Sequence, residues 1–384
     1  MRSVVHWDAD RFFASIEQAA DRRLRGRPLA VGGASRGVVL SASGEARRFS
    51  VFPGLPMRKA RRLCPGLIVL PAHFELYEQF FGQILGLCHQ TTPLVEPLAV
   101  GAAYLDLTGT RALLGADAAT VVERLRQTVR EWLRVSLSTG IAANKLVARM
   151  AARLRKPHGQ VMVPAGEEAA FLAPRPLGWL PGIGPQTQAT LEVAGMTTVG
   201  ELARAPLDAL ELVLHRRALP LQRLAQGVDE EPVRPRAAAA RSFQESVDFA
   251  EDAWEEPLLL DALRALVDRL MARVRAGGVE VRRLSLEVRY TDRAEDAGSV
   301  TLAEPTAVET DFYPHLNALL RGAWRRRVRL RALTLRATRL YRPSPQMSLF
   351  ETAPLRTPAA LAAAIDALRR LYGENAVQHG WKIV

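Results

Sequence analysis

The sequence predicts an α/β (α+β) fold divided into several domains, and three observations lead to this prediction. First, the chain has 384 residues, 48% of them apolar, which is too long for one ordinary hydrophobic core. Second, strand and helix patterns alternate up to about residue 163 as β–α–β–β–α–β, which predicts helices on one face of a small antiparallel or mixed sheet. Third, a region of short helices, 167–228, separates this part from a second α/β stretch.

The first α/β part opens with a β-type run from Ser3 to Trp7, followed by a helix from Phe12 to about Ala20. Residues 28–43 predict two short strands around a Gly-rich turn. Periodicity and Pro/Gly punctuation predict the remaining elements: helices at 45–49, 56–63, 73–90, 117–132 and 143–155, and strands at 135–141 and 160–163.

The stretch EPLAVGAAYLDLTGT, residues 96–110, predicts one further strand. Val100, Ala102, Tyr104 and Asp106 would share one face of its pleat. The Gly-Ala pair at its centre is unfavourable in a strand, and two explanations stay open: other residues formerly stood there, or something passes close to the backbone.

The helical region contains the sequence LPGIGP, in which Gly182 and Gly184 frame a tight turn. One helix is expected to begin near Gln186 and a second near Thr198, which is the pattern of a helix–hairpin–helix. Backbone N–H groups at such a turn suit a phosphate, so DNA-backbone binding is one interpretation and a plain helix-capping turn is the other.

Residues 229–240 have the composition of a linker, and strand and helix patterns resume beyond them. The last strand, WRRRVRLRALTLRATRLYRP, changes phase near Ala332, which predicts a β-bulge. It carries several arginines beside apolar partners: Arg329, Arg331, Arg336 and Arg339. An arginine-lined strand can be merely solvated, but this density favours contact with a nucleic-acid backbone.

The composition favours a polyanionic partner. The net charge is +12, and this surplus of positive charge is typical of proteins that bind nucleic acid, although a GC-rich genome can explain the preference for arginine over lysine. The two cysteines, Cys64 and Cys88, lack the spacing of a zinc site or a disulfide framework. Without a membrane span or a secretion signal, we expect a cytoplasmic protein with no membrane partner.

Near the C-terminus, QMSLF at residues 346–350 combines one polar anchor with two apolar side chains, a pattern typical of peptides that bind in pockets. Residues 357–373 predict a final amphipathic helix.

Five motifs in order resemble the Y-family translesion DNA polymerases of the bacterial DNA polymerase IV type. They are DADRFFASIEQ (8–18), SASGEARRFSVFPGLPMRKARRLCP (41–65), STGIAANKLVARMAARLRKPHGQVMV (138–163), LPGIGP and QMSLF. The resemblance implies a right-hand architecture whose four domains would occupy these residues: a ferredoxin-like palm (1–10 and 74–166), fingers (11–73), a helix–hairpin–helix thumb (167–228) and, after the linker, an α/β little finger (241–342). Residues 343–384 would form a clamp-binding tail with Gln346, Leu349 and Phe350 as contacts.

The resemblance also implies roles for individual residues. Asp8 and the carbonyl of Ala9 match metal ligands, and Asp10 matches a supporting acid, although an Asp at a strand end can simply cap a helix. Phe13 matches the steric gate that excludes a 2′-hydroxyl, although such a Phe is otherwise a core residue. Arg47 and Lys156 match the two cations that hold the incoming triphosphate.

The same comparison shows departures from the family pattern. Gly101 and Ala102 stand where the family has the Asp and Glu that complete its two-metal site, and Gly44 stands where a triphosphate-binding Tyr is usual. Asp106 and Glu96 would lie about 13 and 17 Å along the strand from the missing acids. We therefore expect weak or absent Mg²⁺ binding and reduced catalysis.

Three hypotheses follow. The leading one is a catalytically impaired monomer, similar to ImuB-type members, that binds damaged primer–template DNA, the sliding clamp (β subunit) and, as a further candidate partner, another polymerase. The second is an active, error-prone translesion polymerase with altered metal coordination. The third is a basic DNA-binding scaffold that shares only the fold.

Overall fold

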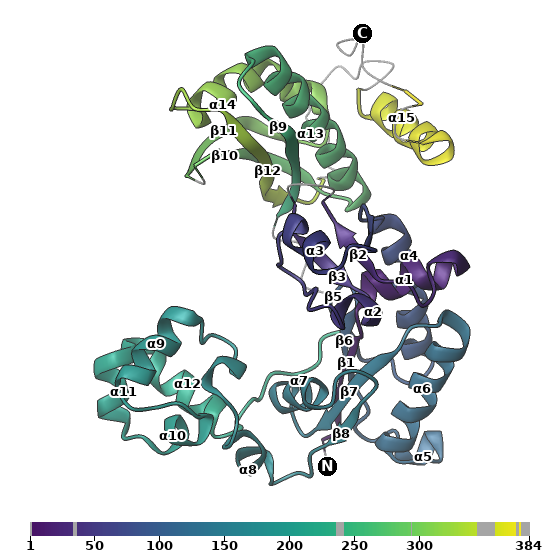
Figure 1. Cartoon of the computed structure of the whole chain (residues 1–384), viewed down its shortest axis with the longest axis vertical. Coiled ribbons are helices and arrows are strands. Elements are labelled where there is room, and N and C mark those ends of the chain that lie inside the picture. The colour runs from purple at the N-terminus through teal and green to yellow at the C-terminus, as the bar shows by residue number, and fades with distance from the viewer. Residues whose placement is uncertain are drawn as a thin grey trace, which may run out of the picture. The chain divides into compact units, whose positions relative to one another are not determined.

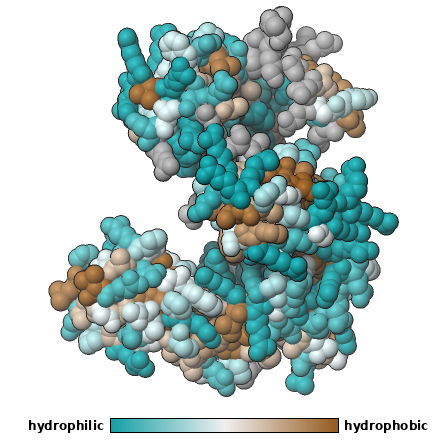
Figure 2. Space-filling model, in the orientation of Figure 1, coloured by the Kyte–Doolittle hydropathy of each residue, from teal (hydrophilic) through white to brown (hydrophobic). Residues whose placement is uncertain are grey.

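The computed structural model describes residues 2–33, 37–235, 242–292, 294–343, 358–373 and 376–377. The chain divides into two compact units, Met1–Ala237 and Ala238–Val384, and each has hydrophobic clusters of its own (Figure 1). Hydrophilic residues cover most of the face seen in Figure 2, in keeping with the 24% of charged residues.

The central sheet of the first unit has the strand order β5-β6-β1-β7-β8. Its strands are β5 (Val95–Ala99), β6 (Ala102–Asp106), β1 (Val4–Ala9), β7 (Leu137–Ala142) and β8 (Gln160–Met162). β1 is antiparallel to both of its neighbours, and β8 runs parallel to β7. The expected β–α–β–β–α–β order is therefore present, with a mixed sheet.

Helices cover both faces of this sheet, so the expectation of one covered face was wrong. α4 (Phe74–His89) and α6 (Ala118–Leu133) bury apolar side chains with Val5 and Trp7 of β1. On the opposite face, α7 (Lys145–Leu154) packs with Val4 and with the small helices that follow. Alternate residues of β1 thus enter two different cores, and all of Val4–Trp7 is buried.

Residues 95–106 form a β-hairpin and not one strand, which corrects the sequence prediction. Ala99 pairs with Ala102, and Val100 and Gly101 form the connection. Gly101 has φ +99°, a backbone region that glycine adopts more readily than other residues. Apolar alternation continues on both sides of this two-residue turn, which explains why the pattern resembled a single strand.

A smaller sheet, ordered β3-β2-β4, follows the first strand. It comprises β2 (Leu29–Gly32), β3 (Val39–Ala42) and β4 (Ile68–Leu70). α2 (Gly44–Arg47) and α3 (Met57–Leu63) share its hydrophobic cluster. α1 (Phe12–Ala20) connects β1 to this region.

The segment after β8 contains helices only, as predicted. They are α8 (Glu168–Leu172), α9 (Pro185–Val193), α10 (Val199–Arg204), α11 (Leu207–Leu214) and α12 (Ala218–Ala225). The side chain of Asn144 donates a hydrogen bond to the carbonyl of Gly227 at 2.8 Å, and Asp229 accepts one from the Leu146 amide. These bonds fix the end of the helical segment to the start of α7.

The second unit holds a four-stranded antiparallel sheet ordered β11-β10-β12-β9. Its strands are β9 (Phe243–Ala253), β10 (Glu280–Tyr290), β11 (Glu295–Thr306) and β12 (Leu330–Tyr341). α13 (Glu256–Ala276) and α14 (Leu316–Ala323) share the core of this unit with the sheet. The register shifts between Leu330 and Ala332, which confirms the expected bulge.

A last helix, α15 (Pro358–Tyr372), is joined to α13 by ion pairs. Arg275 contacts Asp366 at 2.7 Å, and Arg369 lies 3.8 Å from Asp268. The sequence predicted this helix. Among the described residues, no helix combines the length and the apolar character that a membrane crossing requires.

Candidate active site

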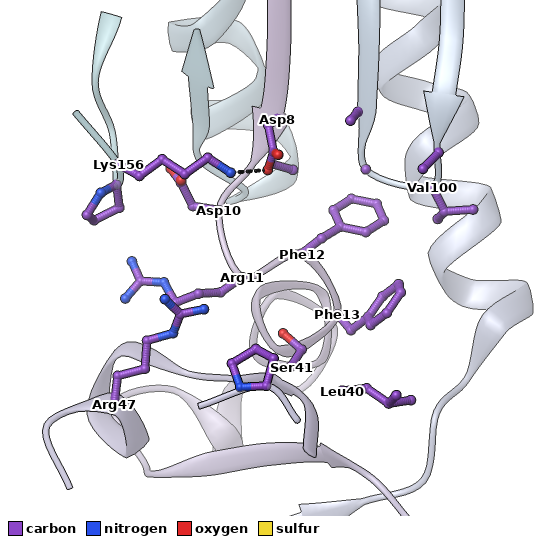
Figure 3. Close-up of a pocket in the computed structure, with 16 residues that line it drawn as sticks. Asp8, Asp10, Arg11, Phe12, Phe13, Leu40, Ser41, Arg47, Val100 and Lys156 are labelled. Carbon is purple, nitrogen blue, oxygen red and sulfur yellow. Dashed lines mark ion pairs between the residues drawn. The ribbon is translucent and has the colours of Figure 1, made fainter. Parts of the chain in front are cut away.

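A pocket of about 430 Å³ lies where β1 ends and α1 begins (Figure 3). Its walls come from the end of β1, the Val100-Gly101 turn, the region around β3 and α2, and the loop after α7. The predicted site residues that line it are Asp8, Ala9, Asp10, Phe13, Arg47, Gly101, Ala102 and Lys156. The fold therefore brings together residues from four separate sequence motifs.

Asp8 faces a cation in this pocket. Its carboxylate lies 2.5 Å from Nζ of Lys156, and each side chain is about one-third exposed, at 37% and 35% (Figure 3). The strand register places Asp8 opposite Ala102. A methyl group therefore stands opposite Asp8 in the neighbouring strand.

Asp10 points into the protein and is fully engaged there. Its carboxylate accepts hydrogen bonds from Ser136 Oγ at 2.8 Å, Ser138 Oγ at 2.7 Å and the His158 amide at 2.9 Å. The side chain is buried. Asp10 thus ties the end of β1 to β7 and to the loop after α7, which shapes the pocket.

Phe12 explains the glycine at position 101. A Cβ added to Gly101 would lie 3.0 Å from Cγ and Cδ1 of the Phe12 ring, closer than side chains normally approach. The Gly101 carbonyl also accepts a hydrogen bond from the Ala9 amide at 2.8 Å, which holds the turn against β1. The aromatic ring is therefore what passes close to the backbone at this point.

The residues present do not fit a two-metal site. Of the acids in the pocket, Asp8 is paired with Lys156, and the buried carboxylate of Asp10 already accepts three hydrogen bonds. Across the part of the chain that the structure describes, no group of three or more His, Cys, Asp or Glu side chains could hold a metal ion.

The two nearby acids do not replace the missing ligands. Glu96 contacts Nζ of Lys145 at 2.8 Å and accepts a hydrogen bond from the Arg234 amide at 2.7 Å. Asp106 lies opposite Val4, at the other end of β1 from Asp8, and accepts a hydrogen bond from the Thr108 amide.

Phe13 forms an aromatic wall of the pocket. Its ring stacks on Tyr77 with the centroids 4.6 Å apart, and Phe74 contacts it edge-on. Tyr77 donates a hydrogen bond to Glu17 at 2.6 Å, and burial together with this bond raises the pKa of the Tyr77 phenol. Phe13 is therefore held in place by its aromatic partners.

Arg47 has a neighbouring cation that the sequence analysis missed. Arg47 lies in α2, whose first turn is capped by the Ser43 side chain. Arg11 adopts a left-handed backbone conformation, φ 54°, and a Cβ at Gly44 would collide with its guanidinium. Burial and the charge of Arg11 lower the pKa of Arg47. The only sequence signals were an Arg inside the first motif and the glycine at position 44.

The expected helix–hairpin–helix turn is present in the helical segment. Gly182 has φ +88°, and Gly184 is the N-cap of α9. Arg217, which the sequence analysis did not single out, donates a hydrogen bond to the Gly182 carbonyl. The second helix, α10, begins with a capping box between Thr198 and Glu201.

Three of the four arginines predicted on the last strand differ in their surroundings. Arg336 is exposed, pairs across the sheet with Ser285, and donates to Gln244 Oε1 at 2.9 Å. Arg329 stacks over Trp254, with its guanidinium carbon 5.9 Å from the ring centroid, and Arg331 is half-buried beside the bulge. Gln346, Leu349 and Phe350 lie outside the described residues.

The mixed α/β fold of this chain matches the fold of solved Y-family DNA polymerases. Residues 7–153 match the impB/mucB/samB family model, and residues 240–349 match the model of its C-terminal domain. The chain belongs to this family, the Y family of DNA polymerases.

Individual relatives agree with this assignment. The chain is 36% identical over 382 residues to DNA polymerase IV of Opitutus terrae, covering 99% of this chain and 97% of that one. It is 39% identical to DNA polymerase IV of Streptomyces coelicolor, covering 79% of this chain and 64% of that one. The solved structure of a Y-family DNA polymerase chimera has a TM-score of 0.80 at 23% identity and covers 89% of this chain and 100% of its own, which confirms the expected fold class.

Proposed function

We propose that this protein is a catalytically impaired Y-family member that binds primer–template DNA in translesion synthesis. One observation supports the impairment: Lys156 neutralises Asp8, and Gly101 and Ala102 stand where the family pattern has two further acids. Nucleotidyl transfer needs divalent metal to stabilise several kcal/mol of developing charge, so loss of these ligands lowers the rate by orders of magnitude.

Charge and local structure support DNA as the partner. The chain carries a net charge of +12, the α9 turn presents backbone N–H groups, and Arg336 is exposed on the sheet of the second unit. A solved relative is named the insertion ternary complex of Dbh DNA polymerase. In this proposal the palm, fingers, thumb and little finger occupy the ranges that the sequence predicted.

Metal-dependent primer extension tests the impairment. The wild-type chain is assayed with Mg²⁺ and with Mn²⁺, beside DNA polymerase IV of Opitutus terrae as the active control. We expect extension at least about 10³-fold slower than in the control. Two results together would contradict the impairment: template-dependent extension at the control rate, and loss of that extension in the Asp8→Ala variant.

An active polymerase with altered metal coordination is the second candidate. The retention of Asp8, Phe13, Arg47 and Lys156 around one pocket favours it, as does identity to proteins named DNA polymerase IV along almost the whole chain. Extension that appears with Mn²⁺ and is lost in Asp8→Ala would support this candidate.

The clamp peptide belongs to the same proposal. We expect a Leu349→Ala, Phe350→Ala double variant to lose capture by immobilised sliding clamp. A variant with Met347→Ala and Ser348→Ala, at the intervening positions, serves as the matched control. Equal capture of both variants would contradict the assignment of Gln346, Leu349 and Phe350. We expect the protein to act as a monomer.

A further inference from the structure

Three side-chain cations from three elements surround the pocket at the end of β1. Arg11 comes from the start of α1, Arg47 from α2 and Lys156 from the loop after α7. The acids that line the pocket are Asp8 and Asp10, and Asp10 is buried beneath it. The pocket therefore carries a surplus of positive charge.

Arg11 and Arg47 repel one another, and the negative charge of Asp10 only partly offsets burial and the charge of Arg11, so the pKa of Arg47 stays lowered. Figure 3 shows their guanidinium groups next to each other, and the charge of Arg11 contributes to the lowered pKa of Arg47. Neither guanidinium forms an ion pair or a hydrogen bond with another residue in the ranges that the structure describes. An anion placed between them would relieve this repulsion.

The neighbouring residues leave room for this arrangement. Gly44 has no side chain, and any Cβ there would displace the guanidinium of Arg11. Glu45, the acid next to Gly44, accepts a hydrogen bond from Gln18 Nε2 at 3.3 Å, and hydrogen bonds together with the charge of Arg11 lower its pKa. The glycine thus allows a cation from the first motif to occupy the space above α2.

Lys156 supplies positive charge beside the Asp8 carboxylate, as a bound metal ion would. Its ammonium lies 2.5 Å from the carboxylate and neutralises it, so an incoming phosphate meets no unpaired acid on that side. We infer that this pocket binds a polyphosphate, such as the triphosphate of a nucleotide, through side-chain cations alone and without a divalent metal ion. The inference deepens the proposed function and rests on it, because it describes the same site.

The shape of the pocket favours a nucleotide. A volume of about 430 Å³ is in the range of small-molecule sites. Phe13 lines the same pocket and offers an aromatic surface beside the cations. The same cations could also bind a phosphate of the DNA backbone. The test therefore compares a nucleotide triphosphate with an oligonucleotide phosphate.

Binding to the full-length protein is measured by calorimetry in EDTA and in Mg²⁺, with dGTP, inorganic tripolyphosphate and a 5′-phosphorylated oligonucleotide as separate probes. We expect dGTP and tripolyphosphate to bind at least as tightly in EDTA as in Mg²⁺, and tripolyphosphate to displace dGTP. Loss of dGTP binding in EDTA would overturn the inference. Binding of the oligonucleotide alone would also overturn it.

Substitutions of the pocket arginines distinguish binding by side-chain cations from metal-dependent binding. Arg11→Gln and Arg47→Gln should each weaken dGTP binding in EDTA by about tenfold or more, because each removes charge-assisted hydrogen bonds. Arg48→Gln, an exposed arginine adjacent to Arg47 that does not line the pocket, is the matched control and should bind like wild type. Equal affinities in all three variants would contradict the assignment.

Asp8→Asn gives the sharpest distinction. Without metal, removing this carboxylate releases Lys156 and should tighten dGTP binding several-fold; in a metal-dependent site it would weaken binding. Weaker binding would therefore overturn the inference. Thermal unfolding of each variant checks that the fold is intact. Primer extension is measured separately from nucleotide binding. The proposal of impaired catalysis and the proposal of metal-free binding can therefore be contradicted independently.

Discussion

Single residues determine the shape and charge of the pocket at the end of β1. Gly101 lies in a turn against Phe12, Asp10 is used as a structural acceptor, and Arg11 occupies the space beside Gly44. Three residues around the positions of the expected acids thus have structural roles of their own. Two residues of this group give direct tests of stability.

Gly101→Asp should lower the free energy of unfolding more than Gly109→Asp does. Both glycines have positive φ, +99° and +78°, but only the first has a ring 3.0 Å from the added Cβ. Displacing Phe12 should cost about 1–3 kcal/mol beyond the shared backbone strain. Urea denaturation of both variants measures the difference, and equal losses would contradict the role of the ring.

Asp10→Asn should be more destabilising than Asp8→Asn. The buried Asp10 carboxylate accepts three hydrogen bonds, and an amide cannot accept all of them without an unfavourable N–H contact. We expect a loss of about 1.5–3 kcal/mol for Asp10→Asn and under about 1 kcal/mol for the partly exposed Asp8→Asn. Chemical unfolding measures both, and the reverse order would contradict this account.

At the scale of elements, periodicity and the positions of Pro and Gly predicted most helices and strands. The helices 73–90 and 117–132 correspond to Phe74–His89 and Ala118–Leu133. The hairpin at 95–106 was missed because a two-residue turn preserves alternation. The strand Glu295–Thr306 was not predicted, because its acidic and glycine-containing start gives little apolar signal.

The capping box of α10 should make the stability of the helical segment depend on pH. Hydrogen bonds from the amides of Thr197 and Thr198 lower the pKa of Glu201 to about 2. Since the folded pKa lies below the unfolded value of 4.5, the stabilisation is complete above pH 4.5 and is lost as the pH falls towards 2.

Glu201→Gln should therefore lower the midpoint of thermal unfolding near pH 7, and the difference from wild type should shrink below pH 4.5. Glu211→Gln, at an exposed position in the next helix, serves as the control and should show no such pH-dependent difference. A difference that is constant with pH would argue against the capping role.

Arg336→Gln should reduce the salt dependence of DNA affinity. If Arg336 contacts a phosphate, its loss should reduce the slope of log K against log salt by about one unit. Arg321→Gln changes an exposed arginine of α14 that pairs with Glu256, and it should leave the slope unchanged. Fluorescence anisotropy over a salt series measures both, and equal slopes would contradict a phosphate contact.

For the whole molecule, the sequence predicted the fold class and the grouping of distant motifs around one pocket. It could not predict the geometry inside that pocket. The position of Arg11 depends on a left-handed residue and on the absence of a side chain at Gly44, which only tertiary contacts determine. The hydrogen bonding of Asp10 likewise depends on serines more than 120 positions away in sequence.

The second unit should fold on its own. Its hydrophobic cluster contains residues of that unit only, from Ala253 to Ala337 among the buried members. A fragment of residues 242–373 should therefore show the far-ultraviolet circular dichroism of a mixed α/β domain and one cooperative thermal transition. A fragment without a cooperative transition would contradict the independence of this core.

The attachment of α15 to α13 has a consequence for the proposed clamp peptide. Strand β12 ends at Tyr341, and α15 begins at Pro358 and is fixed by the Arg275–Asp366 and Arg369–Asp268 pairs. The proposed clamp peptide therefore lies, in sequence, between two elements of the same unit. A clamp bound to it would be linked to this unit from both sides, through β12 and through α15.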